Sequence, residues 1–325
     1  MYRCKSCKRY FQIDYSPNPP DHRELLVRYL DGTPTRKLAK QLKMSQAKVM
    51  ALLLKALKNV PNNNRITEGL SKRFSGYLML DAKYVSVKGR SRKMAFIWVI
   101  DYYKHDILFS LLVPDETYTA YWNCLKFLKR INVPVRAIIC DEHKAILQAS
   151  QAVFPRARIQ YCHTHILRNI QYQLDVRVSQ EDRIFLKKIK GVFTSKKVVE
   201  YSRKATVMVR RYGGNPKYLA ILADLDRKHE QLITYLIDRR CPRTTNLIEG
   251  YNSHLAQRLK AIKGFESYAT AEMWLNAFTV LKRITPFTDC EGRFSRLNGE
   301  SPLFQTVEDA GPVSKVYEYF GREFR

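Results

Sequence analysis

The 325-residue sequence holds 57 Lys and Arg against 30 Asp and Glu, a formal net charge of +27, with 45% hydrophobic and 12% aromatic residues. This composition excludes a disordered polycation, predicts a folded protein and favours an anionic partner, with nucleic acid ahead of a membrane surface. The apolar runs are too short to span a bilayer, no signal segment follows Met1, and the seven scattered cysteines favour a reducing compartment. We therefore expect a cytoplasmic protein with no membrane partner.

Residues 1–15 are predicted to form a partial zinc ribbon. Cys4 and Cys7 are spaced C-x-x-C, which lets one turn direct two thiolates at a metal ion. A tetrahedral zinc site needs four ligands, and the sequence contains no second C-x-x-C. Two interpretations therefore stay open: a site that binds Zn²⁺, and a half-ribbon without metal. The Pro-rich residues 16–20 connect this segment to the next.

Residues 20–60 are predicted to form a helix-turn-helix DNA-binding domain. Apolar residues repeat at helical spacing in three segments, and a tight corner at 43–45 makes the last two helices cross. Ser45 is the expected N-cap of the last helix, whose exposed Gln46 and Lys48, with Lys55 further along, would face base edges or phosphates. The alternative is a helical packing unit with a solvated basic face.

A short linker is predicted at residues 61–65, and the pattern beyond it changes to strands. The expected order is three strands (77–87, 94–103, 107–114), a helix (117–131), a strand (135–140), a helix (143–153) and a strand (158–161). This order predicts a mixed α/β sheet covered by helices. Residues 164–239 are almost wholly helical, with a break at 210–216, and helices follow at 245–261 and 274–282.

Two of the apolar strands lead into an aspartate, Asp81 and Asp141. A buried carboxylate is costly unless it is paired, solvated or bound to a metal. If the two strands are neighbours, the two carboxylates can hold a divalent cation, and oxygen ligands suit Mg²⁺ or Mn²⁺. Glu249, at the start of a predicted helix, is the expected third ligand. Each acid taken singly could instead be an ordinary strand-end or surface carboxylate.

The order Asp81, Asp141, Glu249 resembles that of DDE transposases with an RNase H-like fold and an all-helical insertion before the last acid. The segment from Cys140-Asp-Glu-His to Cys162-His-Thr-His resembles the mutator-type transposases of bacterial insertion sequences and their Mutator-like relatives. Residues 244–253 are similar to the segment that bears the final Glu of that family. The likeness covers about residues 77–283.

This resemblance implies an α/β fold: an RNase H-like mixed sheet flanked by helices, with an all-helical insertion, preceded by the partial zinc ribbon and the helix-turn-helix. The first part of the catalytic core would cover residues 75–169, the insertion 170–240, the last part of the core 241–285, and a C-terminal tail 286–325. Cys162 and His165 match the C-x-x-H motif, which would brace the strand leading into the insertion. Taken alone, this pair could be two zinc ligands or a buried structural thiol with a polar neighbour.

The resemblance also implies a transposase that binds double-stranded DNA at the ends of its insertion sequence, cleaves it and transfers the strand to target DNA. Asp81, Asp141 and Glu249 would be the catalytic residues and would hold two Mg²⁺ or Mn²⁺ ions, with Asp81 bridging both. We expect a homodimer or larger assembly on DNA, in the nucleoid of a bacterial or archaeal cell. The alternatives are a catalytically silent DNA-binding regulator derived from a transposase, and a nuclease that never joins strands.

Overall fold

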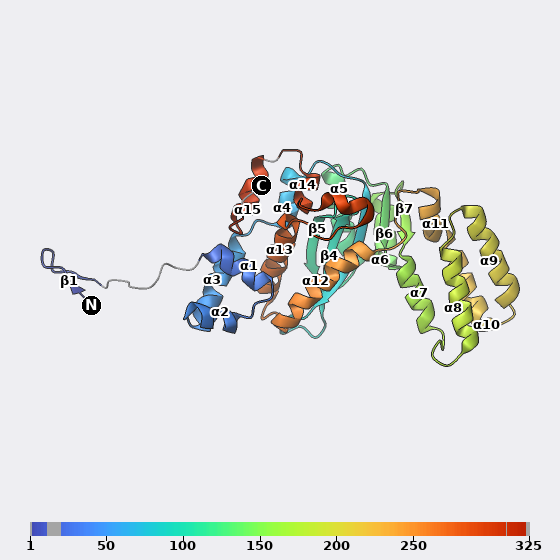
Figure 1. Cartoon of the computed structure of the whole chain (residues 1–325), viewed down its shortest axis with the longest axis horizontal. Helices are drawn as coiled ribbons and strands as arrows, with labels where there is room; N and C mark the ends of the chain where they lie inside the picture. The colour runs from blue at the N-terminus through green and yellow to red at the C-terminus, as the bar shows by residue number, and fades with distance from the viewer. Residues whose placement is uncertain (1, 12–20, 310, 323–325) are drawn as a thin grey trace.

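The computed structural model describes residues 2–11, 21–309 and 311–322 (Figure 1), so the Pro-rich segment 16–20 lies outside the described residues. Strands β1 (Tyr2–Arg3) and β2 (Tyr10–Phe11) pair antiparallel around the turn that holds Cys4 and Cys7. Cys4 is partly exposed and Cys7 is exposed. Neither belongs to a group of three or more potential metal ligands in the described part of the chain. Both interpretations of this C-x-x-C therefore stay open.

A five-stranded mixed sheet with the order β5-β4-β3-β6-β7 forms the centre of the molecule. Strands β3 (Tyr77–Val85), β4 (Met94–Asp101) and β5 (Asp106–Val113) form an antiparallel meander. Strands β6 (Ala137–Cys140) and β7 (Arg158–Tyr161) then run parallel to β3. The predicted mixed sheet is thus confirmed, with β3 and β6 as neighbours.

Alternate residues of β3 face opposite sides of the sheet, as the pleat requires. Leu78 and Leu80 belong to one core, together with residues of α5 and α6, whereas Tyr77 and Met79 belong to a second core with residues of α12 and α13. The bounds of these helices are α5 (Tyr118–Arg130), α6 (Lys144–Val153), α12 (Asn246–Ile262) and α13 (Tyr268–Ile284). The sheet is therefore covered by helices on both faces.

Five helices lie between β7 and α12 in the chain, and Figure 1 shows them at one end of the molecule, beyond β7. They are α7 (His163–Tyr172), α8 (Gln180–Phe193), α9 (Val198–Tyr212), α10 (Pro216–Arg227) and α11 (His229–Ile237). The predicted break is confirmed between α9 and α10, where the Asn215 side chain accepts from the Lys217 N–H and Pro216 takes the first helical position. The chain between β7 and α12 is therefore helical, as the sequence pattern predicted.

Three helices, α1 (His22–Leu30), α2 (Thr35–Leu42) and α3 (Gln46–Asn59), pack together at the opposite end of the molecule (Figure 1). Ser45 caps α3 as predicted, because its Oγ accepts from the Lys48 N–H at 3.2 Å. Leu26, Leu30 and Leu57 join the core that also contains α13 residues. The N-terminal helices are therefore joined to the sheet domain by a continuous core.

The predicted linker at residues 61–65 is wrong. The helix α4 (Asn63–Leu70) begins within it, capped by the Asn62 side chain, and its Asn63 and Thr67 side chains are buried. Of the polar residues that suggested a loop, Asn63 is buried, and its side chain accepts a hydrogen bond from Arg283, a residue far away in the sequence. Arg283 also donates to the hydroxyl of Thr67, further along the same helix. A run of polar residues in the sequence does not reveal that a distant residue will bury one of them.

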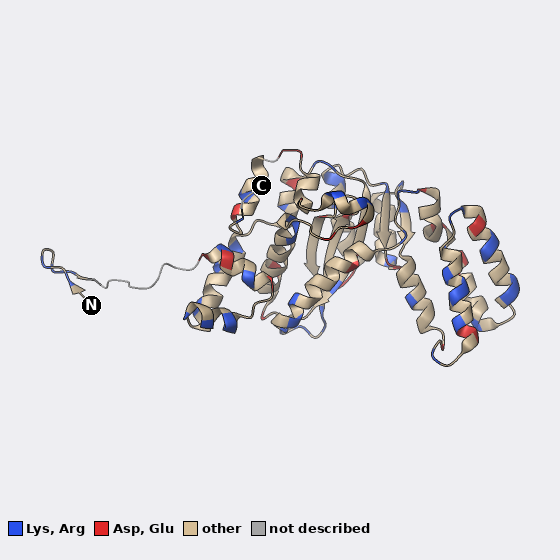
Figure 2. Cartoon of the chain, viewed as in Figure 1, with Lys and Arg blue, Asp and Glu red and all other residues tan. Residues whose placement is uncertain are grey.

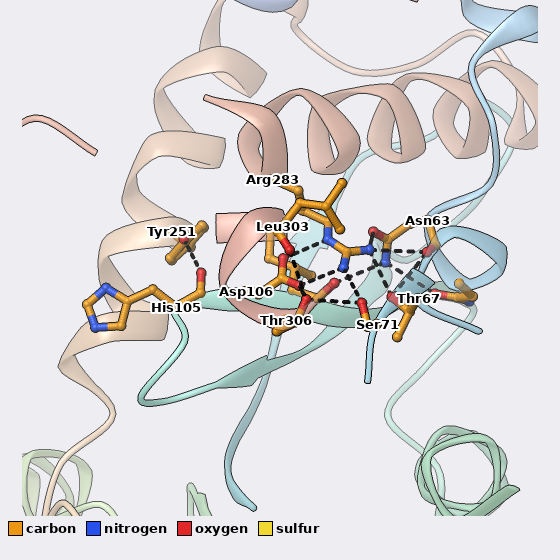
Figure 3. Close-up of polar contacts among 11 residues, drawn as sticks. Asn63, Thr67, Ser71, His105, Asp106, Tyr251, Arg283, Leu303 and Thr306 are labelled. Atoms are coloured by element: carbon orange, nitrogen blue, oxygen red, sulfur yellow. Dashed lines mark hydrogen bonds and ion pairs between the residues drawn. The ribbon is translucent and has the colours of Figure 1, made fainter. Parts of the chain in front are cut away.

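Arg283 and Asp106 form a fully buried ion pair that joins α13 to β5 (Figure 3). The Arg283 Nε and Nη2 atoms donate to the two Asp106 carboxylate oxygens at 2.7 and 2.6 Å. The Thr306 hydroxyl, from α14 (Pro302–Thr306), donates to the same carboxylate at 2.5 Å. Both carboxylate oxygens of Asp106 therefore accept hydrogen bonds within the core, and buried charges need such partners to be stable.

The described part of residues 286–325 packs onto the sheet domain through short helices: η1 (Gly292–Leu297), α14 and α15 (Gly311–Glu318). Leu303, Val307 and Val313 are buried in the same core as α13. Within the described ranges, no helix has both the length and the apolar character needed to cross a membrane.

Candidate active site

The parallel pairing of β3 and β6 places Asp81 beside Asp141. Leu80 is aligned with Cys140, and each aspartate is the next residue along its chain. Asp81 shares its face of the sheet with Met79, which packs on the α12 side. Strand β3 pairs with β6 only as far as Leu80, whereas it pairs with β4 as far as Val85. Asp81 is therefore the first residue of β3 beyond the end of β6.

Helix α12 supplies two polar side chains to this face of the sheet. Glu249 stands in its first turn, where the helix N-terminus favours a carboxylate. Asn252, one turn later, donates from Nδ2 to Asp81 Oδ2 at 2.5 Å and accepts at Oδ1 from the Trp98 indole N–H at 2.9 Å. Because an indole nitrogen can only donate, Trp98 fixes which end of the amide faces Asp81. No pattern in the sequence pointed to Asn252 as a residue of the site.

His165 lies between the other two acids. Its Nδ1 contacts Asp141 Oδ1 directly, and its Nε2 lies 3.9 Å from Glu249 Oε1. The contact with the Asp141 carboxylate, with a smaller contribution from Cys162, raises the pKa of His165 to about 10. His165 therefore carries a positive charge at neutral pH and partly offsets the acids.

Cys162 and Thr245 connect the two ends of the helical insertion. The Thr245 N–H and hydroxyl lie 3.3 and 3.1 Å from Cys162 Sγ, and the same hydroxyl lies 3.1 Å from Glu249 Oε1. Next to this contact, the His163 N–H donates to the Arg243 carbonyl at 3.0 Å. Burial opposes ionisation of Cys162, but hydrogen bonds from His165 and Thr245 outweigh it and lower the pKa of the thiol. The start of α7 is thus fixed against the start of α12.

The site carries more negative charge than its protein partners neutralise. Burial, and next the charge of Asp141, raise the pKa of Asp81 to about 7. In the described part of the chain, no Lys or Arg forms an ion pair with Asp81, Asp141 or Glu249. Such a set of oxygen donors fits a divalent cation of the Mg²⁺ or Mn²⁺ type, because the cation would supply the missing positive charge.

The residues predicted to bind DNA lie on α3, apart from the acids. Gln46, Lys48 and Lys55 are all exposed. The Gln46 side chain donates to Thr35 Oγ1 at 2.9 Å, so it links α3 to α2. Lys55 lines a cleft of about 860 Å³ that residues of α1 and α15 complete. Figure 2 shows further Lys and Arg on α2, α8 and α9, so positive charge lies at both ends of the molecule.

The fold and the site together define a mixed α/β protein whose acidic site lies between the sheet and the helix that follows a helical insertion. Residues 22–282 match the family described as "Transposase, Mutator family". The chain belongs to the Mutator family of transposases. Similar relatives are the transposases for insertion sequence element IS256 in transposon Tn4001 of Staphylococcus aureus and Enterococcus faecalis, each 24% identical over 269 residues, which cover 78% of this chain and 67% of theirs.

Solved transposase structures resemble the chain more distantly. The Drosophila P element transposase strand transfer complex is 12% identical and covers 85% of this chain and 79% of its own, with a TM-score of 0.31. The Mos1 mariner paired end complex with Mn is 14% identical and covers 67% of this chain and 81% of its own, with a TM-score of 0.21. TM-scores this low establish no shared placement of residues, so the family assignment rests on the sequence match.

Proposed function

We propose that this chain is a DDE transposase, which cleaves DNA at the ends of its insertion sequence and transfers the strand to target DNA with Asp81, Asp141 and Glu249. The observation that carries the proposal is the meeting of these acids: Asp81 lies on β3, Asp141 directly follows the adjacent parallel strand β6, and Glu249 lies on the helix beside them. Family membership supports the class of reaction. The strand order and the insertion before Glu249 support an RNase H-like core.

The three acids would together hold two divalent ions, either Mg²⁺ or Mn²⁺. When bound, such ions activate water and offset negative charge on the attacking and leaving oxygens of a phosphodiester. Asn252 holds one Asp81 oxygen in place, and His165 orients Asp141. Trp98 and Thr245 in turn fix Asn252 and Glu249. These contacts keep the acids in a set geometry before any substrate binds.

The reaction has two displacements at phosphorus. In the first, a water oxygen bonds to the phosphorus at the element end and the P–O3′ bond breaks. The leaving 3′ oxygen takes up one proton to become a 3′-OH, and the other water proton passes from the new 5′-phosphate to solvent. In the second, that 3′-OH attacks a phosphorus of the target and displaces its 3′ oxygen, which takes up a proton from solvent as the attacking hydroxyl releases its own. No net oxidation occurs in either step.

The basic surfaces would bind the DNA backbone. Gln46, Lys48 and Lys55 on α3 are the proposed contacts to the element ends, and the Lys and Arg of the insertion lie at the other end of the molecule (Figure 2). Binding that releases counterions weakens steeply as salt rises. Two ends processed together imply a homodimer or larger assembly on DNA.

The test is to incubate the chain with DNA that carries the element ends and with a supercoiled target plasmid, in Mg²⁺ or Mn²⁺. Nicked ends together with joined products support the proposal. Cleaved ends without joined products would identify a hydrolytic nuclease instead. DNA binding without metal-dependent cleavage would identify a silent regulator and would overturn the proposed reaction.

A further inference from the structure

Three potential metal ligands of different chemistry meet where α7 and α12 begin. A thiol sulfur of Cys162, a ring nitrogen of His165 and a carboxylate oxygen of Glu249 all lie within 4.8 Å of one another. Cys162 is the N-cap of α7 and His165 lies in its first turn, while Glu249 lies in the first turn of α12. Two helix starts, fixed to each other by Thr245, therefore direct these side chains at one point.

The contacts around the three groups are those of a transition-metal site. His165 turns Nδ1 to the Asp141 carboxylate and Nε2 towards Glu249, at 3.9 Å from Oε1. A carboxylate on one imidazole nitrogen orients the ring and leaves the other nitrogen for a metal. The thiol sulfur, in turn, accepts a hydrogen bond from the Thr245 N–H, as a metal-bound thiolate does, and lies 3.1 Å from the Thr245 hydroxyl oxygen.

We propose that Cys162, His165 and Glu249 form a zinc site, and that Zn²⁺ bound there inhibits the transposase. Thiolate and imidazole ligands favour Zn²⁺ over Mg²⁺, and three protein ligands with water as the fourth are common for zinc. Zinc takes these ligands as a thiolate and a neutral imidazole, so any proton that the thiol or the coordinating ring nitrogen carries passes to solvent on binding. Inhibition rests on the proposed function, because the Glu249 oxygen that zinc occupies is no longer available to the magnesium ions of the proposed site.

The metal-binding part is tested without DNA, by adding Co²⁺ as a spectroscopic substitute for Zn²⁺ to the full-length chain. A Cys4→Ser, Cys7→Ser background removes the N-terminal thiols, and Cys290→Ser is the control for a partly exposed thiol outside the cluster. We expect a thiolate-to-Co²⁺ absorption band that excess Zn²⁺ abolishes. The band disappears in Cys162→Ser and persists in Cys290→Ser. A spectrum without the band, or one unchanged by Cys162→Ser, overturns the site.

Glu249→Gln and Asp141→Asn keep the test decisive if Cys162→Ser fails to fold, since both acids are only partly buried. We expect Zn²⁺ affinity to fall at least tenfold in Glu249→Gln, and about 10- to 100-fold in Asp141→Asn through loss of the carboxylate behind His165. Unchanged affinity in both variants overturns the assignment of these ligands.

The inhibitory part is tested by titrating Zn²⁺ into Mg²⁺-dependent cleavage of element-end DNA in the same background. We expect cleavage to stop as the site fills, and to recover when a chelator selective for Zn²⁺ is added. Cleavage that continues with the site saturated would contradict the competition for Glu249. A chain that binds Co²⁺ as expected but never cleaves DNA would sink the proposed function and leave the zinc site standing.

Discussion

Asn252 offers a direct way to perturb Asp81 without touching any of the acids. Asn252→Ala removes the donor that lies 2.5 Å from Asp81 Oδ2 and the acceptor that lies 2.9 Å from the Trp98 indole nitrogen. A hydrogen bond to a charged group contributes about 1.5–3 kcal/mol, which corresponds to roughly 10- to 100-fold in an equilibrium constant. We therefore expect the Mn²⁺ concentration for half-maximal DNA cleavage to rise by about that factor.

Trp98 should act only through Asn252, which makes the pair suitable for a double-mutant cycle. Trp98→Phe keeps an aromatic ring but frees the Asn252 amide to rotate, so we expect a smaller rise in the Mn²⁺ requirement. The double variant should match Asn252→Ala alone, because the effects of residues in one hydrogen-bond network are not additive. The assay is the Mn²⁺ dependence of cleavage, with Ser253→Ala, at the exposed next position of α12, as the matched control.

Two results would refute this reasoning. One is an Asn252→Ala protein with the Mn²⁺ dependence of the wild type, which would mean that Asp81 needs no support from α12. The other is a double variant whose effect is the sum of the two single effects, which would mean that Trp98 acts by another route. Thermal unfolding of each variant separates loss of positioning from loss of fold.

Three further predictions concern stability and DNA binding. Arg283→Met leaves the buried Asp106 carboxylate without its ion-pair partner, so we expect the free energy of unfolding to fall by about 3–5 kcal/mol in urea titrations. Arg258→Met, at a partly exposed pair, should cost at most about 1 kcal/mol. A loss below about 1 kcal/mol for Arg283→Met would contradict the role of the buried pair. Burial lowers the pKa of His163 from 6.5 to about 4, so its neutral form stabilises the fold above pH 6.5 and that contribution is lost as the pH falls towards 4. This amounts to about 1.4 kcal/mol per pH unit within that window, and a His163→Phe protein with the wild-type pH dependence of unfolding would disprove it. Lys48→Ala should reduce the slope of log binding constant against log salt by about 0.9 for element-end DNA, and an unchanged slope would show that Lys48 contacts no phosphate.

Local sequence patterns predicted the elements of this fold well, because strand and helix periodicity depend on neighbouring residues. The apolar runs before Asp81 and Asp141 predicted β3 and β6, and Ser45 predicted the start of α3. That β3 and β6 are neighbours does not follow from either run. It follows from how the antiparallel meander and α5 return the chain to the sheet, which only the structure displays.

The contacts missed from the sequence are those between residues far apart in the chain. Trp98 is fully buried, and its indole N–H donates to Asn252, which lies 154 residues away in the sequence. Asn63 was assigned to a linker because it stands in a polar run, whereas Arg283, 220 residues later, makes it a buried partner. A polar residue in a local pattern therefore says little about burial until its partner is known.

The most direct test of the central claim is the cleavage of element-end DNA by Asp81→Asn, Asp141→Asn and Glu249→Gln proteins in Mn²⁺. Each change removes one negative charge with little change in shape, and DNA binding, measured in parallel, reports whether the fold is intact. We expect all three proteins to bind the DNA as the wild type does and to lose cleavage and strand transfer. Wild-type cleavage by any one of them would contradict the assignment of that residue to the catalytic set.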